Sequence, residues 1–158
     1  MTLVEVFPPS AWIHDLKARD KRNALKELLQ HLVTLGHLKG ESVKKAEKAV
    51  QSREQQGSTA IGKGLAIPHA KGCSFAKNVL GVFARSSEGV PFDAVDGGLV
   101  HVLFLVISPE KLVNEHTDLM RRIARFHMDE KTLRFLAKSQ FLDNLQEIFK
   151  EVDDYFVS

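Results

Sequence analysis

The chain has 158 residues, of which 44% are hydrophobic and 27% charged, an ordinary balance for one globular domain. A net charge of +2 gives no support to nucleic-acid binding. No apolar run approaches the roughly 20 residues that cross a bilayer, and the N-terminus lacks the features of a secretory signal. The single cysteine, Cys73, excludes an internal disulfide and fits a reducing compartment. We therefore expect one cytoplasmic domain over residues 1–158, without membrane insertion.

The first third of the chain predicts two helices. Residues 12–38 have the pattern of an arm followed by an amphipathic helix, which Asp20 can cap. Residues 41–55 predict a second helix, with small apolar residues on one face and lysines on the other. This second helix would deliver Arg53 and Glu54 at its C-terminal end.

Strands follow, and then helices again. From His116 onward, apolar residues recur at helical spacing through Phe141 and Leu142 to Phe149. Helices before and after a group of strands predict an α/β sandwich with helices on both faces of the sheet. The β-prone segments are residues 59–61, 65–67, 79–84 and 100–107, and an apolar piece at 90–98 leads into a glycine turn.

Residues 53–71, REQQGSTAIGKGLAIPHAK, gather the groups that phosphoryl transfer to histidine requires. Neutral histidine is a nucleophile, and its ordinary pKa of roughly 6.5 leaves much of it neutral near pH 7. Pro68 restricts the backbone so that the chain enters His69 extended. Gly62 and Gly64 allow the backbone to turn or to approach a ligand closely.

Three other side chains of this segment are candidates for binding phosphate oxygens. Arg53 offers a planar guanidinium, and Ser58 and Thr59 offer hydroxyls. Thr59 is the favoured hydroxyl, although the sequence does not separate it from Ser58. Glu54 is expected to make a structural hydrogen bond.

The segment closely resembles the signature of the fructose/mannitol-type enzyme IIA domain of the bacterial phosphoenolpyruvate-dependent sugar phosphotransferase system. In that family, the histidine of G-x-G-[LIV]-A-[LIV]-P-H is phosphorylated by the phosphocarrier protein HPr. Residues 62–69, GKGLAIPH, match this signature, and REQQGST stands in register upstream. The resemblance extends more weakly from about residue 16 to about residue 149. It implies a mixed sheet flanked by helices, His69 as phosphoryl acceptor, and no cofactor or metal.

The family carries a second histidine near the start of a helix that follows the long apolar strand. The matching segment here is EHTDLMRRIA, which makes His116 the expected partner of His69, although Thr117 replaces the usual leucine. An imidazole N–H near a helix N-terminus can bind a phosphate oxygen. A zinc site on the two histidines is disfavoured, because zinc sites need at least three protein ligands at characteristic spacings. The remaining histidines are interpreted as structural: His14, His31, His37, His101 and His127.

The expected reaction moves a phosphoryl group to His69 from phosphohistidine on HPr or its nitrogen-branch counterpart. Because the donor is a protein, His69 should be at least partly exposed in a shallow depression, with an apolar rim that includes Leu65 and Ile67. Two roles fit: a regulator whose partner binding depends on phosphorylation, or a sugar-uptake component that passes phosphate to a IIB domain. We favour the regulator, which is typical of the nitrogen-type branch. Its support is the sequence GSTAIGKGLAIPHAK and the lack of attached IIB, IIC or HPr segments. A binding module that keeps the fold without phosphotransfer is the third alternative.

Overall fold

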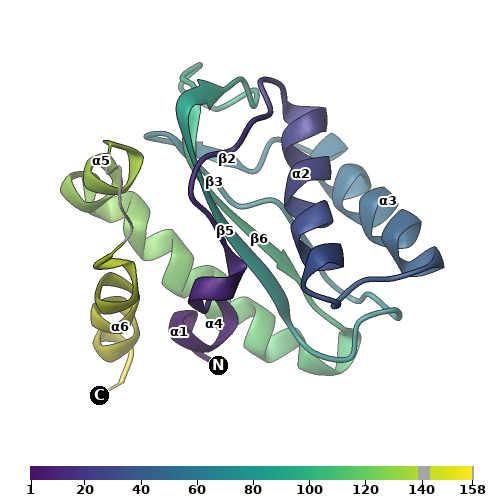
Figure 1. The fold of residues 1–158 in the computed structure, drawn as a ribbon. Coiled ribbons are helices and arrows are strands. Elements are labelled where there is room, and N and C mark those ends of the chain that lie inside the picture. The colour runs from purple at the N-terminus through teal and green to yellow at the C-terminus, as the bar shows by residue number, and fades with distance from the viewer. Residues whose placement is uncertain (139–142, 158) are drawn as a thin grey trace.

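The computed structural model describes residues 1–138 and 143–157. It consists of a mixed β-sheet with helices on both faces, which confirms the predicted fold class (Figure 1). The predicted helical positions Phe141 and Leu142 lie outside the described residues. Within the part of the chain that is described, no helix is both long and apolar enough to span a bilayer.

The sheet is built around β6 and has the strand order β1-β5-β6-β3-β2, with β4 also paired to β6. β6 runs antiparallel to β5 and parallel to both β3 and β4. β6 therefore carries β5 along one edge and β3 and then β4 along the other. The strands are β1 (Trp12–Ile13), β2 (Ala60–Gly62), β3 (Leu65–Ala66), β4 (His69–Ala70), β5 (Leu80–Val90) and β6 (Val100–Ile107).

Two helices cover one face of the sheet. They are α2 (Lys21–Thr34) and α3 (Glu41–Gln55), and the predicted bounds of α3 are confirmed. Asp20 caps α2 as expected, since its carboxylate accepts a hydrogen bond of 2.9 Å from the Asn23 backbone N–H. α2 packs against β5, and its leucines share one buried cluster with alternate residues of β6, namely Leu103, Leu105 and Ile107. This period of two is the pattern of a strand covered on both faces.

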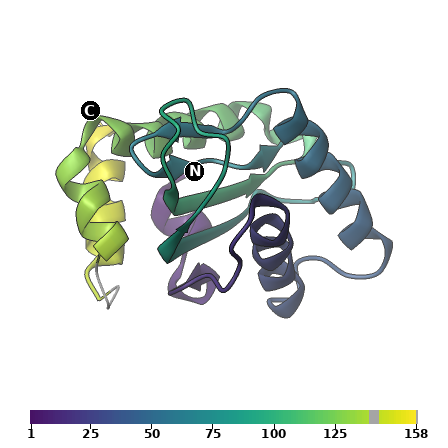
Figure 2. The ribbon, with the colours of Figure 1, turned by 90° about the horizontal axis from the view of Figure 1, so that it is seen from above.

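The opposite face packs on an aromatic cluster. Phe83 and Phe104 meet edge to face with ring centroids 5.1 Å apart, and Phe7, Phe126 and Phe149 surround them. Figure 2 shows the separation of the two helical layers from above, with α3 (blue) and the α5–α6 pair (yellow-green) on opposite sides. The helices of this second layer are α1 (Leu3–Val6), α4 (Val113–Ala124), α5 (Glu130–Lys138) and α6 (Leu145–Tyr155).

Three features differ from the sequence-based expectation. α1 and β1 were not predicted, and α4 begins at Val113 rather than at His116. β5 continues to Val90 beyond the predicted end at residue 84, although polar residues follow. Continuation is possible because the buried Arg85 guanidinium is satisfied, with its Nε donating to the His14 carbonyl at 2.9 Å.

A buried carboxylate links α1, α4 and α6. Asp153 on α6 forms an ion pair with the Arg122 guanidinium of α4 at 3.0 Å. The same carboxylate accepts the backbone N–H groups of Leu3 and Val4 at 2.8 and 3.1 Å, which are free donors at the start of α1. Asp153 is only 5% exposed. The interaction therefore fixes the helix that carries His116 against both ends of the chain.

Replacement of Asp153 by alanine should destabilise the protein by about 1–3 kcal/mol, because it removes the acceptor of the Leu3 and Val4 N–H groups and leaves Arg122 with only the half-buried Asp118 carboxylate. Urea unfolding measures the loss. Asp154→Ala is the matched control: its pair with Lys150 is exposed to solvent, which screens the attraction, so the variant should be nearly as stable as the wild type. Equal losses in the two variants would contradict the role given to Asp153.

Candidate phosphoryl-transfer site

The backbone around His69 is held by the end of β6. His69 lies opposite Val106 in the parallel pairing of β4 with β6. The Pro68 carbonyl accepts the Val106 N–H at 3.1 Å, and the Ala70 carbonyl accepts the Ser108 N–H at 3.0 Å. The chain thus enters His69 extended, as expected from Pro68, and the imidazole is fixed to a rigid central strand.

The glycine pair forms the turn between β2 and β3. Gly62, Lys63 and Gly64 have φ values of +97°, +58° and +78°, which favour glycine and are uncommon for lysine. The Gly64 carbonyl accepts backbone N–H groups of His101 and Val102 at 2.9 and 3.0 Å. Of the two roles open to these glycines, the turn is the one observed, and it aligns β3 beside β6.

A cavity of about 540 Å³ opens between α3 and α4, next to β4. It brings together three of the predicted site residues: His69, His116 and Arg53. Of the seven histidines in the sequence, these two line the cavity. The remaining lining residues are Ala49, Ser52, Gln56, Ala70, Lys71, Thr117 and Met120.

The hydrogen bond of His69 decides which of its ring nitrogens can react. Nδ1 lies 2.8 Å from the Ile67 carbonyl oxygen, which can only accept, so Nδ1 carries the proton. Nε2 therefore keeps the lone pair in the neutral ring. Burial lowers the pKa of His69, and the nearby cations Arg53 and Lys71 add to this effect, while the Ile67 bond and Glu54 oppose it. The half-buried imidazole is thus biased toward its neutral, nucleophilic form.

His116 stands beside His69, with ring centroids 5.5 Å apart and an angle of 51° between the rings. It lies in the first turns of α4 and is only 4% exposed. Its Nδ1 is 2.6 Å from the Ser108 hydroxyl oxygen. Burial, followed by the neighbouring His69 and Lys71, lowers the pKa of His116 to about 4. His116 is therefore neutral near pH 7.

Arg53 reaches the cavity from the last turn of α3. Its Nη1 donates to the Gly57 carbonyl at 3.0 Å, just beyond the helix end. Since a guanidinium has five N–H donors, this bond orients the group and leaves other donors for an anion. Arg53 is half-buried, and its charge is close enough to affect the pKa of His69.

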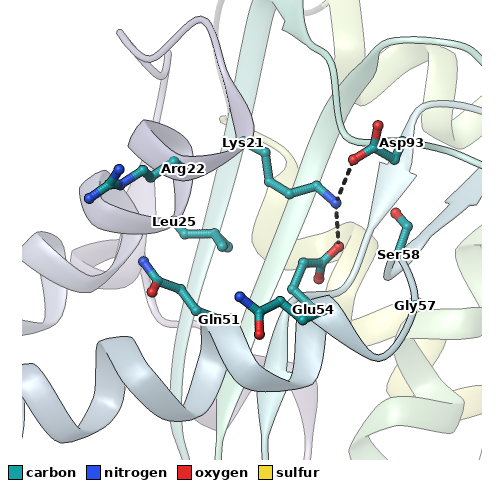
Figure 3. Close-up of a pocket in the computed structure, with 9 residues that line it drawn as sticks. Lys21, Arg22, Leu25, Gln51, Glu54, Gly57, Ser58 and Asp93 are labelled. Carbon is teal, nitrogen blue, oxygen red and sulfur yellow. Dashed lines mark hydrogen bonds and ion pairs between the residues drawn. The ribbon is translucent and has the colours of Figure 1, made fainter.

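The two hydroxyl candidates are directed elsewhere. Thr59 is buried and donates to a Glu54 carboxylate oxygen at 2.7 Å, which is the structural bond expected of Glu54. Ser58 donates to the Phe92 carbonyl at 2.5 Å and lines a second cavity of about 610 Å³. Figure 3 shows Lys21 in that cavity between Glu54 and Asp93, at 3.0 and 3.2 Å. Neither hydroxyl belongs to the lining of the cavity that contains His69.

The expected apolar rim of Leu65 and Ile67 is wrong. These residues are 0% and 5% exposed and pack in the core with Phe104, because alternate residues of an extended chain point to the same face. The half-buried Met120 of α4 supplies apolar surface at the cavity instead.

Lys71 also lines the cavity but was not predicted as a site residue. The sequence could have indicated it, because Lys71 is two residues after His69 and residues i and i+2 of an extended segment lie on the same side.

The lowered pKa of His116 predicts a pH-dependent stability. The unfolded state titrates near the ordinary value of 6.5 and the folded state near 4, so the unfolded chain binds more protons between these values. The free energy of unfolding should therefore rise with pH across this window. The part of it that is linked to the neutral His116 should be lost as pH falls from about 6.5 toward 4. Urea unfolding at pH 7 and pH 5 measures the difference, which should shrink in His116→Gln.

The exposed His37 provides the control, because it lies outside the cavity. His37→Gln should retain the wild-type difference between the two pH values. The assignment to His116 fails if both variants, or neither, reduce that difference.

Known proteins share both the sequence and this fold. Residues 5–152 match the family described as phosphoenolpyruvate-dependent sugar phosphotransferase system, EIIA 2. A nitrogen regulatory protein of Bradyrhizobium diazoefficiens is 32% identical over 140 residues, which cover 89% of this chain and 89% of that protein. The fructose-specific EIIABC component of Bacillus subtilis is 30% identical over 97% of this chain, which spans only 24% of that longer protein.

The structural comparison agrees with the sequence comparison. The crystal structure of nitrogen regulatory protein IIA-Ntr from Neisseria meningitidis superimposes with a TM-score of 0.82 at 28% identity, covering 92% of this chain and 97% of that one. Together with the family match over residues 5–152, this confirms the resemblance inferred from the GKGLAIPH segment. The chain belongs to the EIIA 2 family of the phosphoenolpyruvate-dependent sugar phosphotransferase system, and it is a phosphocarrier of the enzyme IIA type.

Proposed function

We propose that His69 accepts a phosphoryl group on Nε2 from the phosphohistidine of HPr or its nitrogen-branch counterpart. The observation that carries this proposal is the 2.8 Å bond from Nδ1 to the Ile67 carbonyl, which reserves the lone pair for Nε2. Half-burial and the lowered pKa favour the neutral ring that must attack. The cavity beside His69 leaves room for the transferred group.

In the proposed step, the Nε2 lone pair forms a bond to phosphorus while the donor P–N bond breaks. The donor imidazole, which carries a proton on its other nitrogen, takes the electron pair of that bond and leaves as a neutral ring, while His69 keeps its Nδ1 proton and its ring takes up the positive charge. Such transfers depend on in-line positioning and on stabilisation of the charge spread over the equatorial oxygens. Arg53 and an N–H of His116 supply donors for those oxygens, and Lys71 adds a positive charge at the rim. Ser58 and Thr59 have no part in this step.

For the role after phosphorylation, we propose a regulator whose partner binding depends on the state of His69. Similarity to nitrogen regulatory proteins over most of both chains supports this role. The match to the fructose-specific EIIABC component supports the alternative, a IIA that passes phosphate to a IIB domain in sugar uptake. A cytoplasmic location suits either role. Incubation of the phosphorylated chain with a fructose IIB domain separates them: rapid loss of the phosphoryl group would favour sugar uptake.

Intact-protein mass spectrometry tests the acceptor directly. Incubation with phosphoenolpyruvate, enzyme I and HPr, or the nitrogen-branch counterparts, should add one acid-labile phosphoryl group to the wild type. His69→Ala should remain unmodified, whereas His37→Ala should be modified like the wild type because His37 is exposed and outside the cavity. Absence of modification with both sets of carriers would leave a binding module that only retains the fold.

Arg53→Gln should slow phosphoryl transfer to His69 by about 100-fold, the effect of removing one preorganised donor to a developing anion. Arg22→Gln removes the same charge from the second cavity and should leave the rate unchanged. Rapid-quench measurement of phosphorylated protein gives both rates. Equal slowing would show that only the overall charge matters and would contradict a local role for Arg53.

A further inference from the structure

Ser108 ends the buried strand edge on which the site is built, directly after β6. Its backbone N–H donates to the Ala70 carbonyl at 3.0 Å, and its carbonyl accepts the Cys73 N–H at 2.9 Å. Its side chain is 0% exposed. The hydroxyl oxygen lies 2.6 Å from His116 Nδ1, which is the one hydrogen-bond partner that the described residues give this hydroxyl.

The direction of this hydrogen bond follows from satisfying both groups. A neutral imidazole has one N–H and one lone pair. If Nδ1 of His116 carried the proton, Ser108 would accept it, and the buried hydroxyl hydrogen would have no acceptor among the described residues. If Nδ1 carries the lone pair, Ser108 donates and both groups are satisfied. An unmade buried hydrogen bond costs about 1–3 kcal/mol, so the second arrangement is favoured.

That direction determines what His116 offers to the cavity. With the lone pair on Nδ1, the proton lies on Nε2, which becomes a hydrogen-bond donor. His69 has the opposite arrangement, with its proton on Nδ1 and its lone pair on Nε2. The two adjacent rings would then hold complementary tautomers, one nucleophile and one donor. Phosphoryl oxygens only accept hydrogen bonds, so a lone pair on Nε2 of His116 would repel them.

We propose that Ser108 is a positioning residue that holds His116 as the Nε2–H tautomer and so provides a donor for the phosphoryl group on His69. The role rests on the proposed function, but the tautomer itself is a property of the unphosphorylated protein. Ser108 is bonded to His116 and would influence the phosphoryl group only by way of that imidazole. Its hydroxyl therefore acts on orientation and proton placement, not on the reacting atoms.

The first test is imidazole ¹⁵N–¹H correlation NMR of the unphosphorylated wild type at pH 7. The expected spectrum shows His116 protonated on Nε2 and His69 protonated on Nδ1. Protonation of His116 on Nδ1 would overturn the proposal. Because no phosphoryl donor is present, this result is independent of whether His69 later proves to be the acceptor.

The second test compares Ser108→Thr with Ser108→Val, which have nearly the same shape and differ in the hydroxyl. Ser108→Thr should retain the Nε2–H tautomer and a transfer rate close to that of the wild type. Ser108→Val should show a mixture of His116 tautomers and transfer about 10-fold slower, by analogy with the lower end of the losses seen when the orienting partner of a metal-bound histidine is removed. Slower transfer in Ser108→Val with an unchanged tautomer would overturn the proposal, as would equal slowing in both variants. If neither variant folds, the wild-type spectrum still decides the question.

Discussion

The parallel pairing of β4 with β6 is the constraint on which the site depends. β4 is only two residues long, yet it carries His69, and its backbone is fixed through Pro68, Ala70 and the end of β6. β6 is almost entirely buried and is covered on both faces, so it offers a rigid template. The residue after β6, Ser108, contacts the second histidine. One strand end thus positions both imidazoles of the cavity.

Burial has a chemical consequence at this site. Both imidazoles lose hydration that would favour their charged forms, and nearby cations strengthen the effect. In the proposed transfer, His69 would therefore act as a neutral nucleophile, and His116 as a neutral donor that does not add a full charge beside it. The fixed positive charges come from Arg53 and Lys71, which line the same cavity. This separation of roles suits transfer of an anionic group between histidines, because the nucleophile stays neutral while the anion meets permanent cations.

Most of the fold could be predicted from the sequence because its main elements have strong local patterns. The bounds of α3 and β6 followed from apolar periodicity and continuous apolarity. α1 could not be predicted in this way, since it has only four residues. Its start is held by the Asp153 carboxylate, which is far away in sequence. The continuation of β5 likewise depends on distant partners of Arg85.

The candidate site could be predicted in part. The segment 53–71 predicted His69 and Arg53, the separate segment EHTDLMRRIA predicted His116, and the structure brings these three to one cavity. The sequence could not show whether the hydroxyl of Ser58 or Thr59 faces the cavity. The direction of a side chain at the start of an extended segment depends on tertiary contacts, such as that of Thr59 with Glu54. The tautomer of His69 was also beyond the sequence. It is set by a backbone carbonyl, and so by the folded geometry.

The most direct test of this account is ³¹P–¹⁵N NMR of the phosphorylated chain prepared with ¹⁵N-labelled histidine. We expect phosphorus coupled to Nε2 of His69, with the proton still on Nδ1 and its bond to Ile67 retained. Phosphorus on Nδ1 of His69, or on any other residue, would contradict it, because the Ile67 carbonyl would then not determine which nitrogen reacts.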